Sequence, residues 1–211
     1  MPEPTRPEEN TLYRGLEKVP PELWDDLDAL DPALTAARAG VKYTDTRGYT
    51  VPFLGTDHHV DPRARTITAP EGARPPGFQA GMVLINYLIF ASDQGISGRM
   101  VTERELNGGE LFFKGPHALM KAPVIETFGR DGAAMVERAK AFGAIPAEAG
   151  DAAFKLLVLP KILVSYTLYE ADDEFKAGLT ITFDASMDKH LPLDAIWAMI
   201  NVLSHRLTDL S

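Results

Sequence analysis

The chain has 211 residues, no cysteine and a formal net charge of −9. The lack of cysteine excludes disulfides, thiol catalysis and cysteine-bound metal or iron–sulfur centres. An acidic balance without a basic stripe argues against nucleic-acid binding. The most apolar run, Met82 to Phe90, is far shorter than the about 20 residues of a spanning helix. Because the first residues also lack the apolar run of a signal peptide, we expect a cytoplasmic protein without a membrane span.

Two short helices are predicted near the start of the chain. Before them, residues 1–10 are rich in proline and glutamate, and we expect them to be a disordered lead-in to a single domain over residues 11–211. Apolar residues at helical spacing over residues 20–30 predict the first helix, which opens at a proline pair. Asp31 and Gly40 are the expected caps of the second.

The pattern then changes to the alternation that is typical of strands. Residues 41–53 alternate, with a turn at Arg47-Gly48, and a further strand is expected near Thr66 to Thr68, as in an antiparallel meander. A proline-rich break leads to a helix over residues 78–92. Because this helix is apolar nearly all round, we expect it in the middle of the domain.

The next segments mix short strands, turns and helices. We expect a short strand at residues 100–103 and a turn at residues 107–109. A helix over residues 115–128 is predicted to be broken or kinked at Pro123. A further helix begins at an Asp131 cap and ends at Gly143, and residues 144–152 read as a connection.

The last part carries the clearest strand signal. Strands are predicted at residues 154–159, 162–169 and 179–183, with the acidic run of residues 170–174 as a hairpin tip. An amphipathic helix follows over residues 192–207. Because the strands come in clusters with helices between them, the pattern favours an α+β fold of antiparallel sheets packed with helices over an α/β fold.

Several stretches carry a family resemblance: NYLIFASDQGISGRMVTERELNGGELFF, and above all LYEADDEF, ITFDAS and HLPLDAI. On these residues the chain resembles an uncharacterised family of anaerobic bacteria that is described only as a domain of unknown function. Members often lie beside an iron–sulfur domain of the corrinoid-protein type, which this chain lacks, and Tyr169 stands where a tryptophan is expected. The resemblance implies a protein of anaerobic metabolism with an iron–sulfur or corrinoid protein partner, and it assigns no catalytic residues.

Histidines supply the first candidate site. His58 and His59 follow Asp57, and an imidazole there can bind a haem, a corrinoid or a divalent metal ion. Since neighbouring strand residues point to opposite faces, at most one of the two points inward. The alternative is a polar turn between strands.

A second candidate lies at the expected helix start around His117. Phe112, Phe113 and Lys114 precede this histidine, so the segment can hold a propionate, phosphate or carboxylate, and the imidazole can bind a metal ion. The alternative is a helix start with a hydrophobic anchor. His190, with Asp184 and Asp188 nearby, is a weaker candidate for a divalent ion.

Three functions remain open. The first is a non-catalytic binding or carrier protein for a metal-containing tetrapyrrole-type cofactor, haem or corrinoid, with an apolar pocket lined by residues such as Phe53, Tyr87, Phe112 and Phe113. The second is a protein–protein interaction module with a large exposed apolar patch. The third is a metal-dependent enzyme with at least three converging ligands. A homodimer is plausible because two-fold dimers are common.

Overall fold

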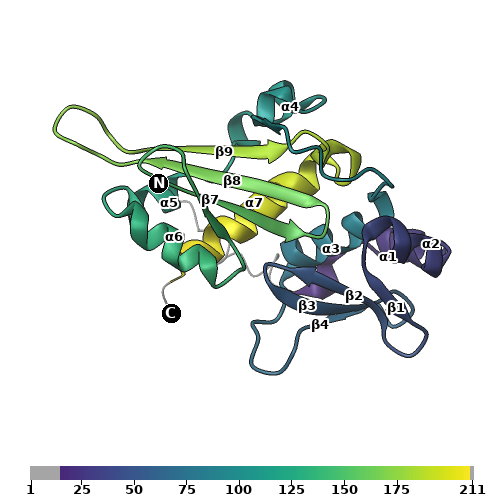
Figure 1. Ribbon diagram of the computed structural model, residues 1–211. Helices are drawn as coiled ribbons and strands as arrows, with labels where there is room; N and C mark the ends of the chain where they lie inside the picture. Colours follow the sequence, from purple (N-terminus) through teal and green to yellow (C-terminus); the bar gives the residue numbers. More distant parts are fainter. Residues whose placement is uncertain (1–14, 210–211) are drawn as a thin grey trace, which may run out of the picture.

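A computed structural model describes residues 15–209 of the chain. These residues form seven α-helices and two antiparallel sheets, which confirms the predicted α+β fold class (Figure 1). The expected lead-in of residues 1–10 lies outside the described residues, as do residues 11–14 of the expected domain.

The helices are α1 (Pro21–Asp28), α2 (Pro32–Ala39), α3 (Phe78–Phe90), α4 (Gly109–Phe112), α5 (Ala122–Phe128), α6 (Gly132–Lys140) and α7 (Leu193–Thr208). The first four strands are β1 (Lys42–Thr44), β2 (Gly48–Phe53), β3 (Thr56–Asp61) and β4 (Thr66–Thr68). The other five are β5 (Met100–Val101), β6 (Ile145–Ala147), β7 (Ala152–Leu159), β8 (Ile162–Tyr169) and β9 (Gly178–Asp184).

The strands form two sheets with short connections. β1 to β4 make a four-stranded meander, and the larger sheet has the order β5-β9-β8-β7-β6. Figure 1 shows α7 crossing one face of the larger sheet, with the meander, α1 and α2 at one end of the molecule. The β8–β9 hairpin extends beyond the rest of its sheet at the other end. Buried side chains from both sheets and from the helices form one continuous hydrophobic cluster.

α7 is the central packing element of this core. It contacts α3, α5 and α6, and its buried face includes Ile196, Ile200, Leu203 and Leu207. The Ser204 hydroxyl lies 3.1 Å from the Tyr166 hydroxyl of β8 and donates a hydrogen bond to a backbone carbonyl of the segment before α5. These polar contacts fix the rotation of α7 on the sheet, because a buried hydroxyl needs its partners.

A buried carboxylate ties the loop after α3 to the larger sheet. Asp184 at the end of β9 is fully buried and accepts hydrogen bonds from the backbone and hydroxyl groups of Ser97 and Ser186 and from the Gly98 N–H, at 2.6 to 2.9 Å. Burial works to raise the pKa of this carboxyl, but the hydrogen bonds outweigh it and hold the pKa at about 2.

The prediction of one helix over residues 115–128 is wrong, because the structure has two separate elements there. A three-residue 3-10 turn, Gly115–His117, is followed by extended backbone at Ala118, and α5 begins only at Ala122. Pro123 therefore lies in the first turn of α5, where its missing N–H costs no hydrogen bond, instead of breaking a helix.

Two strands appear where the pattern does not predict them. β3 contains both His58 and His59, so these residues lie in a ladder with β2 and not in a turn. β6 lies inside the expected connection over residues 144–152 and pairs with β7. Pro146 is tolerated there because β6 is an edge strand, where a missing backbone donor is not needed.

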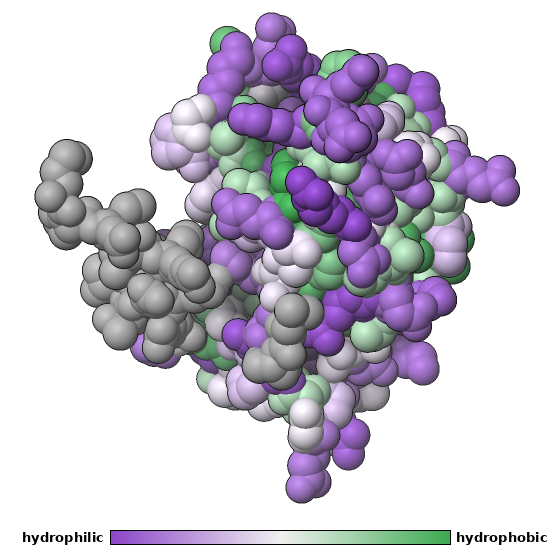
Figure 2. Space-filling view, turned by 90° about the vertical axis from the view of Figure 1, so that its left-hand side faces the viewer, coloured by the Kyte–Doolittle hydropathy of each residue, from purple (hydrophilic) through white to green (hydrophobic). Residues whose placement is uncertain are grey.

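The described surface has no single dominant apolar region on the face seen in Figure 2. That view, from the side where α5, α6 and the β8–β9 hairpin lie in Figure 1, shows small hydrophobic areas between hydrophilic side chains. Exposed apolar side chains lie on different elements, for example Leu111 on α4 and Phe175 in the β8–β9 hairpin. None of the helices within residues 15–209 has the length and apolar character needed to cross a lipid bilayer.

Replacing Asp184 by asparagine is expected to lower the free energy of unfolding by at least about 2 kcal/mol near neutral pH. Because the pKa of the folded carboxyl, about 2, lies below the ordinary value of 3.8, its stabilisation is present above the ordinary value and is lost as the pH falls through the folded value. Urea unfolding over the acidic range should show a flatter pH dependence for Asp184→Asn. Asp173→Asn, in the exposed hairpin, is the control. Parallel pH profiles for the wild type and Asp184→Asn would contradict this account.

Candidate functional site

A tight hairpin between β2 and β3 begins the candidate site. Phe53 pairs with Thr56, so Leu54 and Gly55 form a two-residue turn, with φ of 50° and 72°. Positive φ at both central residues is typical of a type I′ turn, which usually carries asparagine and glycine. A leucine in this region costs about 1 to 2 kcal/mol. Leu54 is nevertheless buried there, at 6% exposure, so its packing offsets the backbone cost.

The hairpin is docked onto the larger sheet by its backbone. The N–H of Leu54 donates a 3.1 Å hydrogen bond to the carbonyl of Val158 in β7. Val158 lies at a register shift between β7 and β8, which leaves it out of the regular ladder and available to the hairpin. On another side, a Cβ added at Gly55 would lie 3.0 Å from the Phe142 carbonyl, so the hairpin also abuts the end of α6.

His58 points inward from β3 and is held by its own strand. Its side chain is 3% exposed, and its Nδ1 lies 3.0 Å from the Thr56 carbonyl. A carbonyl only accepts, so Nδ1 carries the hydrogen, and the neutral ring presents an unshared electron pair at Nε2. Burial lowers the pKa of His58, the positive charge of Arg206 lowers it further, and the Thr56 hydrogen bond opposes them.

A small cavity lies beside His58, where the hairpin, the loop before α3 and the ends of α6 and α7 meet. Its volume is about 100 Å³. The lining residues are Phe53, Leu54, Thr56, His58, Ala73, Arg74, Ala141, Phe142 and Arg206. The cavity therefore joins apolar walls to three nitrogen-bearing side chains from three separate segments of the chain.

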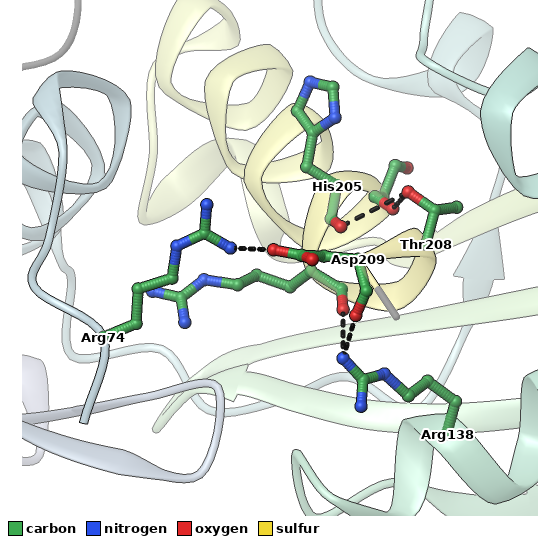
Figure 3. Close-up of polar contacts among 7 residues, drawn as sticks. Arg74, Arg138, His205, Thr208 and Asp209 are labelled. Carbon is green, nitrogen blue, oxygen red and sulfur yellow. Dashed lines mark hydrogen bonds and ion pairs between the residues drawn. The ribbon is translucent and has the colours of Figure 1, made fainter. Parts of the chain in front are cut away.

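Arginines surround the C-terminal end of α7 next to this cavity. Figure 3 shows Arg74 and Arg138 approaching Asp209 from different sides. Arg74 makes an ion pair with the Asp209 carboxylate. Arg138 donates to the backbone carbonyls of Arg206, at 3.4 Å, and of Asp209. Its charge is thus placed on the helix end, where unpaired carbonyls and the helix dipole favour a cation.

Among residues 15–209, positive charge exceeds negative charge at this place. Among residues 15–209, Asp209 is the carboxylate that ion-pairs with Arg74, while Arg138 and Arg206 have no ion pair. Burial lowers the pKa of Arg206 and the neighbouring charge of Arg74 lowers it further, with Asp209 opposing. Two cationic side chains that repel each other at the wall of a cavity favour an added anion.

His59 lies on the opposite face of β3 from His58. Its Nδ1 is 3.1 Å from the Thr50 hydroxyl, and it borders an open depression of about 280 Å³ with Arg47, Asp61, Thr66 and Thr68. The structure therefore separates the two adjacent histidines instead of bringing them to one ligand.

His117 is exposed, does not line this cavity and packs on half-buried aromatic side chains. Its ring stacks on Phe112 with centroids 4.5 Å apart and meets Trp197 edge-on at 5.6 Å. Phe113 is buried, whereas Lys114 is exposed. Because the segment is a three-residue 3-10 turn, it lacks the helix N-terminus that was expected to hold an anion.

The expected apolar pocket is not assembled from the four predicted aromatic residues. Phe53 lines the cavity beside His58, but Phe112, Phe113 and Tyr87 do not. Tyr87 is fully buried in the core, where its hydroxyl donates a 2.7 Å hydrogen bond to the Ala39 carbonyl.

The predicted metal ligands do not converge within the described part of the chain. No group of three or more histidine or carboxylate side chains is arranged there to hold a metal ion. His190 is fully buried, with Nδ1 accepting from the Ser92 N–H at 3.3 Å. Asp184 is occupied by its serine and glycine donors and leaves His190 without this partner.

Arg74 and Arg206 were not singled out by the sequence. Arg74 lies in a proline- and glycine-rich segment, and Arg206 in the last turn of an amphipathic helix, where an arginine is ordinary. Without a fold, no local pattern brings these two residues to His58.

One comparison with known proteins identifies a family. The family model described as "Domain of unknown function (DUF3786)" matches residues 31–206. No curated protein and no solved structure matches the chain.

Replacing Arg206 by glutamine is expected to raise the pKa of His58, because the variant removes a positive neighbour and leaves the burial in place. The pKa should stay below the ordinary 6.5, since burial is the larger cause of its depression. A titration of the His58 ring signals by NMR measures it. Arg47→Gln, beside His59, is the control. An unchanged His58 pKa in Arg206→Gln would show that the two side chains do not interact.

Proposed function

We propose that this chain, which belongs to the DUF3786 family of unknown function, is a non-catalytic binding protein. Its ligand places a compact anionic group in the cavity beside His58. The observation that supports this proposal is the excess of positive charge there. Arg74 and Arg206 line the cavity, and within residues 15–209 one carboxylate, Asp209, pairs with Arg74 and lies near Arg206. In a chain with a net charge of −9, an unbalanced pair of arginines at a cavity wall is a specific feature of the site.

The volume limits what can enter. The cavity of about 100 Å³ has room for about three water molecules, at about 30 Å³ each. Pockets that enclose a whole drug-sized ligand measure about 300 to 1,000 Å³. The cavity therefore suits an anionic head group or side arm, and the remainder of a larger ligand would lie outside it.

A tetrapyrrole-type cofactor, haem or corrinoid, is a second candidate within the same ligand class. The specific observation in its favour is the unshared electron pair at Nε2 of His58, since a backbone hydrogen bond at Nδ1 is the usual support of a metal-binding imidazole. The donor set fits, because arginines can hold the acidic side chains of such a cofactor. The metal would supply ligand exchange or electron transfer, and this chain would bind and orient the group.

The biological setting is proposed on the family resemblance. A place in anaerobic metabolism, in the cytoplasm, with an iron–sulfur or corrinoid protein as partner, accords with a chain that carries no iron–sulfur ligands of its own. His59, His117 and Lys114 remain candidates for contacts with a partner, because they lie at or near the surface.

Anion binding is expected to perturb His58 and to depend on Arg206. Inorganic phosphate, sulfate and acetate are titrated separately against the protein, with NMR of the histidine rings and calorimetry as readouts. Arg206→Gln should weaken binding of the preferred anion by about tenfold or more, the loss of one charge-assisted hydrogen bond. Arg47→Gln should bind as the wild type does. If none of the three anions changes the His58 signals, the proposed function is wrong.

Haem and cobalamin are expected to give a visible-spectrum change on binding if the second candidate holds, because coordination by an imidazole alters the electronic spectrum of the metal. The change should disappear in His58→Ala and persist in His59→Ala, the neighbouring residue on the other face of β3. Spectra that are unchanged by the wild-type protein, or equal changes for both variants, count against His58 as the ligand.

A further inference from the structure

The hydrogen-bonding state of His58 discriminates among anions. Its Nδ1 is committed to the Thr56 carbonyl, so the neutral ring offers only an acceptor at Nε2. The ring is 3% exposed, and no hydrogen bond to Nε2 is formed within residues 15–209. A ligand in the cavity is therefore the group placed to provide this acceptor with a hydrogen.

The charged groups that face His58 favour the neutral ring. Arg206 comes from α7, Arg74 from the loop before α3, and Arg138 stands on α6 beside the same helix end. Asp57 on β3 opposes them, and Asp209 pairs with Arg74. Burial is the largest cause that lowers the pKa of His58, and the charges of Arg206 and His59 lower it further. The cavity therefore combines cationic arginines with an uncharged acceptor.

Anions differ in how well they match this combination. A carboxylate and sulfate are fully deprotonated near neutral pH and only accept hydrogen bonds. Against Nε2 they would place two acceptors together, or would require His58 to take up a proton. Hydrogen phosphate has oxygens for Arg74 and Arg206 and also a hydroxyl hydrogen for Nε2. A phosphate monoester has the same hydroxyl only as its monoanion, below a pKa of about 6.

We propose that the anionic group bound beside His58 is a phosphoryl group that retains a hydroxyl hydrogen, with its oxygens on Arg74 and Arg206 and its hydroxyl donating to His58 Nε2. This inference rests on the proposed function and names the ligand class of the same cavity. The cavity volume of about 100 Å³ accords with one tetrahedral group inside it.

The test compares inorganic phosphate with sulfate, which has the same shape and no hydrogen, by calorimetry from about pH 5 to about pH 8. Phosphate should bind at least about tenfold more tightly than sulfate at the upper end. Sulfate binding should strengthen as the pH falls, because a protonated Nε2 donates to it. The sulfate reaction should also take up a proton, which two buffers of different ionisation enthalpy reveal. Equal affinities at the upper end overturn the inference.

Variants check the assignment to His58. His58→Ala should reduce the ratio of phosphate to sulfate affinity to near unity, while the control His59→Ala keeps the wild-type ratio. An unchanged ratio in a folded His58→Ala overturns the inference. If His58→Ala does not fold, the proton uptake of the wild-type protein decides. It is measured at the upper end of the pH range, where free phosphate is already hydrogen phosphate and needs no further proton. Uptake with sulfate and none with phosphate supports the inference, and equal uptake overturns it.

The two sources of the phosphoryl group are separated by pH. Affinity for a monoester such as glycerol phosphate should fall above about pH 6, where the ester loses its hydroxyl, whereas affinity for free phosphate should not fall there. Acetate that binds more tightly than phosphate overturns the ligand class but leaves the proposed function intact. No binding of phosphate, sulfate or acetate overturns both.

Discussion

The packing of α7 against the larger sheet and α3 is the constraint on which the rest of the structure depends. Ile196, Ile200, Leu203 and Leu207 bury one face of the helix, and each such side chain contributes about 1.5 to 3 kcal/mol. The same packing sets the rotation of the last turn. Arg206, one residue before the buried Leu207, is thereby carried to the cavity wall, and Asp209 is left at the helix end to meet Arg74.

The elements that form the candidate site also stabilise the fold. The β2–β3 hairpin must dock on β7, and it does so through a leucine with positive φ. α6 ends near α7, and Arg138 of α6 links the two helices by donating hydrogen bonds to the backbone carbonyls of Arg206 and Asp209. A small cavity remains where these elements meet, and among residues 15–209 Asp209 is the one carboxylate that ion-pairs with an arginine lining it. Unfavourable backbone conformation and unbalanced charge often gather where a protein binds something, because binding can compensate both.

Asp184 on β9 and Arg206 on α7 illustrate two different uses of charge. Asp184 is a fully buried carboxylate with a complete set of donors, so its charge stabilises the loop after α3 and has no spare capacity for a ligand. Arg206 has the opposite character, since no partner within residues 15–209 forms an ion pair with it. Asp184 therefore serves the packing of the fold. The arginines at the cavity beside His58 can still bind an added anion.

Hydrophobic periodicity in the sequence predicts the secondary structure correctly where the periodic pattern is clear. The α+β class, the apolar helix at residues 78–90, the three long strands and the amphipathic last helix all follow from periodicity, which reports burial on one face. The prediction of a single helix over residues 115–128 was wrong because a proline is compatible both with a kink inside a helix and with the first turn of a new helix. Pro123 lies in the first turn of α5. β3 was missed because its polar residues show no clear alternation, and β6 because it is a short edge strand that contains a proline.

The sequence by itself also determined that His58 and His59 cannot share a face, since adjacent strand residues diverge. Only the tertiary structure decided which of them is inward and what surrounds it. Arg74, Phe142 and Arg206 reach His58 from distant segments, and no local pattern encodes such a meeting. The physical reason is that periodicity records the environment of one element, whereas a cavity and its charge balance depend on how several elements pack together.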